Sequence, residues 1–151
     1  MGKICTFFGH RDAQPDIQEL KQLLRERIEV NDVTTFWCGG YGAFDLAAAK
    51  AVDELQKEYG HISLVLVLAY PLRKPLPALY DSFLYPDFLD TVPKKLCIIK
   101  RNEWMAKNCD IAICMVDHSY GGAYYGYRVA QRNQKLIYNL GNLNPRNSKR
   151  L

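Results

Sequence analysis

Three turns rich in glycine and polar residues follow predicted strands of this chain, and each could hold an anion. They are Gly9-His10-Arg11-Asp12, Gly39-Gly40-Tyr41-Gly42 and Gly121-Gly122. Glycine lets the backbone approach a ligand closely, and a helix that begins after such a turn offers free N–H groups and the positive end of its dipole. This pattern favours phosphate binding, and glycines that serve only the turns are the alternative.

Polar side chains near these turns could contact the rest of such a ligand. Arg11 and Arg101 carry guanidinium groups that can bind a phosphate through paired hydrogen bonds, while pairing of Arg11 with Asp12 or Asp45 is the structural alternative. Asp45 could hold a ribose hydroxyl or cap a helix, and capping is the more common role. Asp117 could accept a hydrogen bond from a sugar or a base. The predicted ligand-binding residues are Gly9, His10, Arg11, Asp12, Gly39, Gly40, Gly42, Asp45, Tyr70, Arg101, Asn102, Asp117, Gly121 and Gly122.

Other catalytic and metal-binding patterns are missing or incomplete. The sequence has no P-loop, the first predicted strand is not followed by GxGxxG, and His118-Ser119 lacks the GxSxG elbow of a hydrolase. The histidines His10, His61 and His118 are far apart in the sequence, and the five cysteines contain no CxxC pair. We therefore expect no metal site, assign no catalytic residue, and interpret the cysteines as small core residues of a cytosolic protein.

The elements that must position these turns alternate between strand and helix. Strands are predicted at 3–8, 34–38, 62–69, 95–99, 111–116 and 136–140. Helices are predicted at about 15–28, 44–59, 79–84, 102–108 and 124–133. Such alternation indicates right-handed βαβ crossovers and a mostly parallel sheet of about six strands with helices on both faces. In such a sheet ligands bind outside the carboxyl ends of the strands, so the three turns should share one edge.

One domain is expected over residues 1–141, and its alternation of strands and helices is interrupted once. Residues 70–93 hold five of the seven prolines and several aromatic residues. We interpret this insert as a flap that covers a ligand, with irregular packing as the alternative. Residues 142–151 form a basic polar tail.

The charge balance excludes a strongly basic nucleic-acid-binding domain. The 151 residues carry a formal net charge of +4, and without Arg146, Lys149 and Arg150 in the tail only +1 is left for residues 1–141. No apolar run approaches the ~20 residues that span a bilayer, and the N-terminus does not read as a signal peptide. We therefore expect a cytoplasmic protein with no membrane partner and no nucleic-acid partner.

Four sequence blocks occur together and in order, and in combination they resemble a known family. The blocks are CTFFGHRD, FWCGGYGAFDLAAAKAV, KRNEWMAKNCDIAICMVD and GGAYYGYRVAQRNQKLIYNLG. They are similar to the YpsA-like branch of the SLOG superfamily, which also includes the Lonely Guy phosphoribohydrolases and the DNA-processing protein Smf (DprA). The resemblance covers residues 3–141 and implies a Rossmann-like, three-layer α/β fold, nucleotide binding, and a bacterial or phage cytoplasm.

The resemblance implies ligand binding by this chain, but it does not imply the reaction of the Lonely Guy enzymes. In Lonely Guy enzymes the Glu of a PGGxGTxxE motif takes part in cleaving the N-glycosidic bond of a nucleoside monophosphate. The matching stretch here begins at Ser119-Tyr120-Gly121-Gly122, and Arg128 stands where that Glu would be. An Arg can neither stabilise an oxocarbenium cation nor act as a base. Arg101 does match the Arg of the family's RKxxM stretch, which implies phosphate and ribose binding.

Three functions follow from these observations, and the first is the leading hypothesis. It is a SLOG-type sensor or processor of a phosphorylated nucleoside-like small molecule, with no other cofactor assigned. The second is an enzyme that cleaves the glycosidic bond of a nucleotide through another carboxylate, from Asp12, Asp45, Asp81 and Asp117. The third is single-stranded DNA binding as in Smf, which the near-neutral core disfavours. We also expect a homodimer, because the aromatic insert offers more apolar surface than one small domain readily covers.

Overall fold

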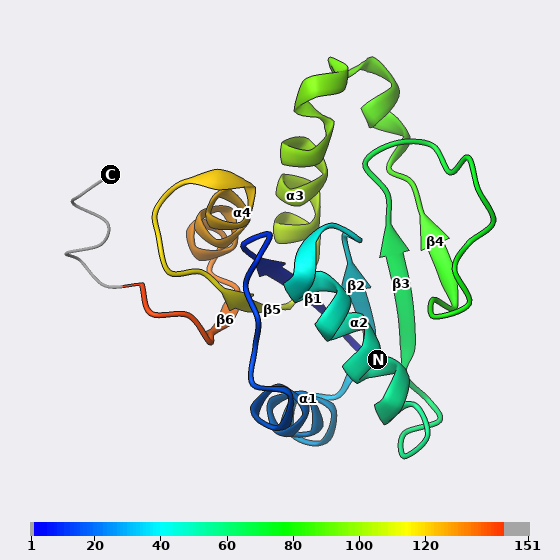
Figure 1. Cartoon of the computed structure of the whole chain (residues 1–151), viewed down its shortest axis with the longest axis vertical. Coiled ribbons are helices and arrows are strands. Elements are labelled where there is room, and N and C mark those ends of the chain that lie inside the picture. The colour runs from blue at the N-terminus through cyan, green and yellow to red at the C-terminus, as the bar shows by residue number, and fades with distance from the viewer. Residues whose placement is uncertain (1, 144–151) are drawn as a thin grey trace.

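The computed structural model describes residues 2–143 and contains one six-stranded sheet in which every pair of neighbours is parallel. The strands are β1 (Lys3–Gly9), β2 (Val33–Cys38), β3 (Ser63–Val67), β4 (Ser82–Leu84), β5 (Ile111–Met115) and β6 (Leu136–Asn139). They lie in the order β4-β3-β2-β1-β5-β6 (Figure 1). This confirms the predicted α/β fold, with all strands parallel rather than most.

Helices cover both faces of the sheet. They are α1 (Ile17–Asn31), α2 (Gly42–Leu55), α3 (Cys97–Asn108) and α4 (Gly121–Arg132). Helices α1 and α2 contact each other, as do α3 and α4. Successive side chains of a strand point to opposite faces, so Phe7 of β1 packs in the core with α1 and α2, whereas Phe8 packs in the core with α3 and α4. The result is the three-layer arrangement that the alternating pattern predicted.

The first helix shows how local sequence fixes an element. Asp16 caps its N-terminus, because the Asp16 carboxylate accepts a hydrogen bond from the N–H of Glu19 at 3.1 Å. Leu20 and Leu24 are fully buried, which confirms the apolar stripe that predicted the helix. The helix ends at Asn31, because the next residue, Asp32, has a left-handed φ of 58° that stops the α-helical run.

The fourth strand is not where the sequence predicted it. Residues 95–99 form no strand: the 3-10 turn η2 (Lys94–Leu96) ends there, and α3 begins at Cys97. A short apolar run has no periodicity that separates a buried strand from the first turn of a helix. Here the run continues into the helix predicted at 102–108, so the two predicted elements are one helix.

The fourth strand of the structure is β4, at Ser82–Leu84. The short helix predicted at 79–84 is therefore wrong as well. Ser82 pairs with Val65 of β3 at the edge of the sheet, and Phe83 is 49% exposed. Three residues of an edge strand are too few for an alternating pattern to reveal them. The remaining predicted elements match within a few residues, except that α2 ends at Leu55 rather than near residue 59.

Residues 70–93 contribute to a small third core beyond β3, together with the residues that flank them. Ala69, Leu89 and Cys97 are buried together there, and the 3-10 turn η1 (Asp87–Thr91) supplies Leu89. All five cysteines of the chain are buried and free, as the interpretation of core residues predicted. This third core holds the insert against the sheet edge, which positions the cavity described below.

Between residues 2 and 143, no helix has both the length and the apolar character needed to cross a bilayer. The polar tail predicted at 142–151 lies outside the described residues from residue 144 onward.

Candidate functional site

The parallel sheet brings the three glycine turns to one edge. They follow β1, β2 and β5, which are adjacent in the sheet and run in the same direction. Gly40, Gly42 and Gly121 have φ angles of 80°, 89° and 90°, which L side chains rarely adopt. The backbone of the turns therefore requires glycine at these three positions, independently of any ligand.

The turns after β1 and β2 are in direct contact. The N–H of Ala43, in the first turn of α2, donates to the carbonyl of Arg11 at 2.7 Å. A Cβ on Gly42 would lie 2.9 Å from Arg11 Cα, and one on Gly9 would lie 2.3 Å from the Phe44 ring. Glycine at these two positions therefore lets the first turn dock against the N-terminus of α2.

The side chain of Arg11 is exposed beside this contact. Across the described residues it makes no ion pair, neither with Asp12 nor with Asp45. Asp12 is likewise exposed on the same turn. The structural pairing considered for Arg11 is therefore not formed, and its guanidinium faces solvent at the edge where the turns meet.

Arg101 is buried instead, and it joins two of the turns. Its Nη1 donates to the carbonyls of Gly39 and Val67, both at 2.8 Å, and the side chain is 2% exposed. Its Nε donates to Oδ1 of Asn102 at 3.0 Å, and Nδ2 of Asn102 donates to the carbonyl of Gly122 at 3.3 Å. Through these bonds α3 ties the ends of β2 and β3 to the N-terminus of α4. Ligand binding by Arg101 and Asn102 stays a prediction.

Asp45 lies under the turn after β2. Its Oδ2 accepts a hydrogen bond from the N–H of Tyr41 at 3.3 Å. Tyr41 is the N-cap residue of α2 and Asp45 lies in the first turn, so Asp45 is not the N-cap that the sequence favoured. Its Oδ1 is buried and has no hydrogen-bond partner among residues 2–143. Burial raises the pKa of Asp45 to about 6, and the Arg101 guanidinium and the Tyr41 N–H oppose that rise. Asp45 therefore supports the turn from below.

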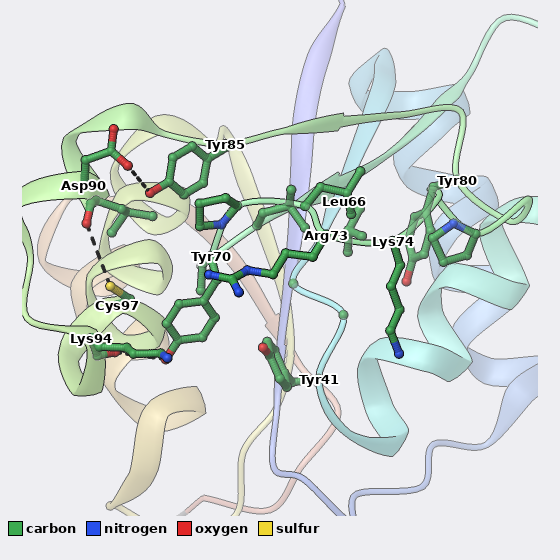
Figure 2. Close-up of a pocket in the computed structure, with 18 of the residues that line it drawn as sticks. Tyr41, Leu66, Tyr70, Arg73, Lys74, Tyr80, Tyr85, Asp90, Lys94 and Cys97 are labelled. Carbon is green, nitrogen blue, oxygen red and sulfur yellow. Dashed lines mark hydrogen bonds between the residues drawn. The ribbon is translucent and has the colours of Figure 1, made fainter.

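A cavity of about 1090 Å³ opens between this turn and residues 70–93 (Figure 2). Aromatic rings and cationic side chains line it: Tyr41, Tyr70, Tyr80, Tyr85, Arg73, Lys74 and Lys94. In Figure 2 the Arg73 side chain extends across the cavity toward Tyr70, with the ring of Tyr41 on the opposite wall. The space thus combines flat apolar faces with positive charge.

Three predicted residues line this cavity, namely Gly39, Gly40 and Tyr70. The Tyr70 hydroxyl also donates to the carbonyl of Lys94 at 2.9 Å, which closes one end of the insert. The cationic residues of the insert were missed by the sequence reasoning. Their segment stood out by its prolines and aromatic residues, but without a periodic pattern no side chain in it could be placed.

The Gly121–Gly122 turn lines a different pocket, of about 570 Å³, whose lining residues come from α3 and α4. Tyr124, Tyr125, Arg128 and Arg132 surround that pocket. The turns after β2 and β5 therefore line two separate pockets. Hydrogen bonds through Arg101 and Asn102 connect the two turns.

The remaining predicted residues meet at the ends of β1 and β5. The backbone N–H of Asp117 donates to Nε2 of His10 at 3.2 Å. The rings of His10 and His118 stack with centroids 3.4 Å apart, and Tyr120 stacks on His118 at 3.8 Å. Burial lowers the pKa of His10, the neighbouring His118 adds to this, and Asp117 opposes it. His118 was not among the predicted residues, because nothing in the sequence links positions 10 and 118.

Comparison with known proteins identifies the fold. No protein-family model and no curated protein match the sequence. The structure is similar to DNA processing protein A from Helicobacter pylori, whose single-stranded DNA binding mode has been described, with a TM-score of 0.63 and 20% identity over 91% of this chain and 64% of that one. It is also similar to DNA processing protein A from Streptococcus pneumoniae, with a TM-score of 0.62 and 16% identity over 91% of this chain and 50% of that one.

This chain thus spans between half and two thirds of the length of these proteins. At such low identity the likeness concerns the fold. The chain is therefore similar in fold to part of DNA processing protein A.

Proposed function

We propose that this chain binds a phosphorylated nucleoside-like small molecule, which it senses or processes, and that it belongs to the YpsA-like branch of the SLOG superfamily. The observation that supports the binding proposal is the cavity of about 1090 Å³ beside the Gly39–Tyr41 turn. It lies outside the carboxyl ends of β2 and β3, where open parallel sheets bind their ligands.

The lining of the cavity suits both parts of a nucleotide. Small-molecule sites usually occupy about 300–1,000 Å³ and are mostly apolar with a few well-placed polar groups. The rings of Tyr41 and Tyr70 offer flat faces for a base. Arg73 and Lys74 are exposed cations at the cavity, and each can donate charge-assisted hydrogen bonds to a phosphate.

Cleavage of a glycosidic bond has less support from the described carboxylates. Asp81 is engaged in the scaffold, because its Oδ2 accepts hydrogen bonds from Nε2 of Gln56 at 2.6 Å and from the N–H of Leu64 at 2.7 Å. Asp45 lies beneath the turn and is not part of the cavity lining. We therefore propose binding as the function and let the experiment below report on turnover.

The proposal is tested by titrating the purified protein with nucleoside monophosphates, NAD, ADP-ribose and a single-stranded oligonucleotide. Calorimetry and thermal shift measure binding, and chromatography of the same samples detects any free base. Saturable binding of one small molecule supports the proposal. Binding of the oligonucleotide alone, weakening steeply with added salt, would replace it with nucleic-acid binding.

The Arg73→Glu, Lys74→Glu double variant is expected to weaken binding of the nucleotide identified in that panel by at least about 10- to 150-fold. Losing one hydrogen bond to a charged group costs about 1.5–3 kcal/mol, and this variant removes two cations and adds two negative charges. Lys57→Glu is the matched control, because Lys57 is an exposed cation that does not line the cavity. Equal affinity in the double variant and the control would place the phosphate elsewhere.

Arg11→Ala is expected to change the free energy of unfolding by no more than about 0.5 kcal/mol, as for other exposed residues without partners. If the phosphate reaches the turn after β1, the same variant weakens nucleotide binding by about 10- to 150-fold. Urea unfolding and calorimetry on one preparation measure both quantities. A large loss of stability with normal binding by the folded protein would assign Arg11 to the scaffold.

A further inference from the structure

The loops that follow β1 and β5 bring two imidazoles and a carboxylate together near the middle of the sheet edge. The metal-ligating atoms of His10, Asp117 and His118 all lie within 4.8 Å of one another. Strand β1 is where the sheet order reverses, since the chain adds β2 and β3 on one side of it and β5 and β6 on the other. A crevice at such a switch point is the usual ligand position in open parallel sheets. None of the three residues lines the cavity assigned above.

We propose that His10, Asp117 and His118 form a binding site for a divalent transition-metal ion such as Zn²⁺. Two histidines and one carboxylate are a typical set of three protein ligands for such ions, and they leave a fourth position for water or for an oxygen atom of an anion. The proposal is independent of the nucleotide cavity and goes beyond the proposed function.

The distances between the donor atoms are close to those that one ion requires. Bonds of about 2.1 Å at tetrahedral angles place two ligand atoms roughly 3.4 Å apart. Oδ1 of Asp117 lies 3.5 Å from Nε2 of His10 and 3.9 Å from Nε2 of His118. These two distances lie within about 0.5 Å of that value, so the carboxylate already stands close enough to each imidazole to share an ion with it.

One hydrogen bond shows that Nε2 of His10 presents its lone pair to the backbone of Asp117. The backbone N–H of Asp117 donates to Nε2 of His10 at 3.2 Å, so this nitrogen is the unprotonated one. A neutral imidazole of this tautomer is the form that ligates a metal. A metal ion would replace this N–H as the partner of the Nε2 lone pair.

His118 is the ligand that must turn. The planes of the two imidazoles are 13° from parallel, so their nitrogen lone pairs run side by side until one ring rotates. His118 lies in the loop between β5 and α4, and its buried Nδ1 has no hydrogen-bond partner in the described part of the chain. Rotation of this ring therefore breaks no hydrogen bond of that nitrogen.

The test is titration of chelator-treated full-length protein with Zn²⁺ by calorimetry, and with Co²⁺ by visible absorption. We expect one equivalent to bind, with Co²⁺ bands typical of nitrogen and oxygen ligands. His118→Ala and Asp117→Asn should each weaken binding by at least about 10- to 100-fold, which is the loss that even outer-shell substitutions cause. His10→Gln should do the same while its amide oxygen can still accept the Asp117 N–H.

His61→Ala is the matched control, because this exposed histidine follows α2, outside the cluster. Its affinity for Zn²⁺ should equal that of the wild type. Thermal melts of all variants without metal identify any variant that fails to fold. If one of the three site variants does not fold, the Zn²⁺ affinity of the other two tests the proposal. Unchanged binding in the folded variants, a Co²⁺–thiolate band from the cysteines, or no saturable binding up to ~100 μM Zn²⁺ would each overturn the proposal.

Discussion

Replacing Arg101 with alanine is expected to lower the free energy of unfolding by about 3–5 kcal/mol, the usual cost of removing one partner from a buried charged network. The guanidinium is 2% exposed and donates to the carbonyls of Gly39 and Val67. Without it both carbonyls lose their charged donor, and the buried Asp45 loses its neighbouring cation. For a chain of this size the melting temperature should fall by about 6–20 °C.

Urea unfolding measures this loss of free energy, and two further variants serve as comparisons. Arg101→Lys keeps the charge but not the planar guanidinium, whose Nη1 donates to the two carbonyls while its Nε donates to Asn102, so we expect an intermediate loss. Arg132→Ala removes an exposed arginine at the end of α4 and should stay within about 0.5 kcal/mol of the wild type. If Arg101→Ala were stable but unable to bind the nucleotide, Arg101 would serve the ligand and not the scaffold.

Asp45 is expected to make the stability of the protein depend on pH between about pH 4 and pH 6. Burial raises the pKa of this carboxyl from 3.8 to about 6, so the folded state prefers its protonated form. The corresponding stabilisation is complete below pH 3.8 and is lost as pH rises through about 6. A shift of about two pH units corresponds to about 3 kcal/mol.

The Asp45→Asn variant isolates this contribution, because an amide has the shape of the protonated acid and does not titrate. Wild type and variant should have similar free energies of unfolding near pH 4. By about pH 7 the wild type should have lost about 3 kcal/mol relative to the variant. Urea unfolding at several pH values measures the difference, in which other titrating groups cancel. A difference that stays constant with pH would mean that Asp45 titrates as an exposed carboxyl does.

Much of the fold follows from local patterns in the sequence. The stripe with Leu20 and Leu24 repeats at helical spacing, and the continuous apolar run at 62–69 has the length of a strand that is buried on both faces. Short segments carry no such repeat, which is why residues 95–99 were assigned to a strand and Ser82–Leu84 to a helix. The edge position of β4 adds to this, because Phe83 is half exposed and gives no buried face to recognise.

Part of the candidate site follows from topology alone. Turns that follow the strands of a parallel sheet emerge at one edge, so the turns containing Gly9, Gly40 and Gly121 could be placed at the same edge from the sequence. The glycines at 40 and 121 are required by positive φ angles. Sequence could identify them as turn glycines, but it could not divide the turns between two pockets.

Only the tertiary structure decided which side chains face a ligand and which hold the scaffold. Arg11 and Arg101 looked equivalent in sequence, yet one is exposed and the other donates to carbonyls 62 and 34 positions away in the chain. His10 and His118 stack although 108 residues separate them. Local sequence patterns report the conformation of neighbouring residues. The partners of a buried guanidinium or imidazole are set instead by how β1, β2, β5 and α3 pack together, and no local pattern carries that information.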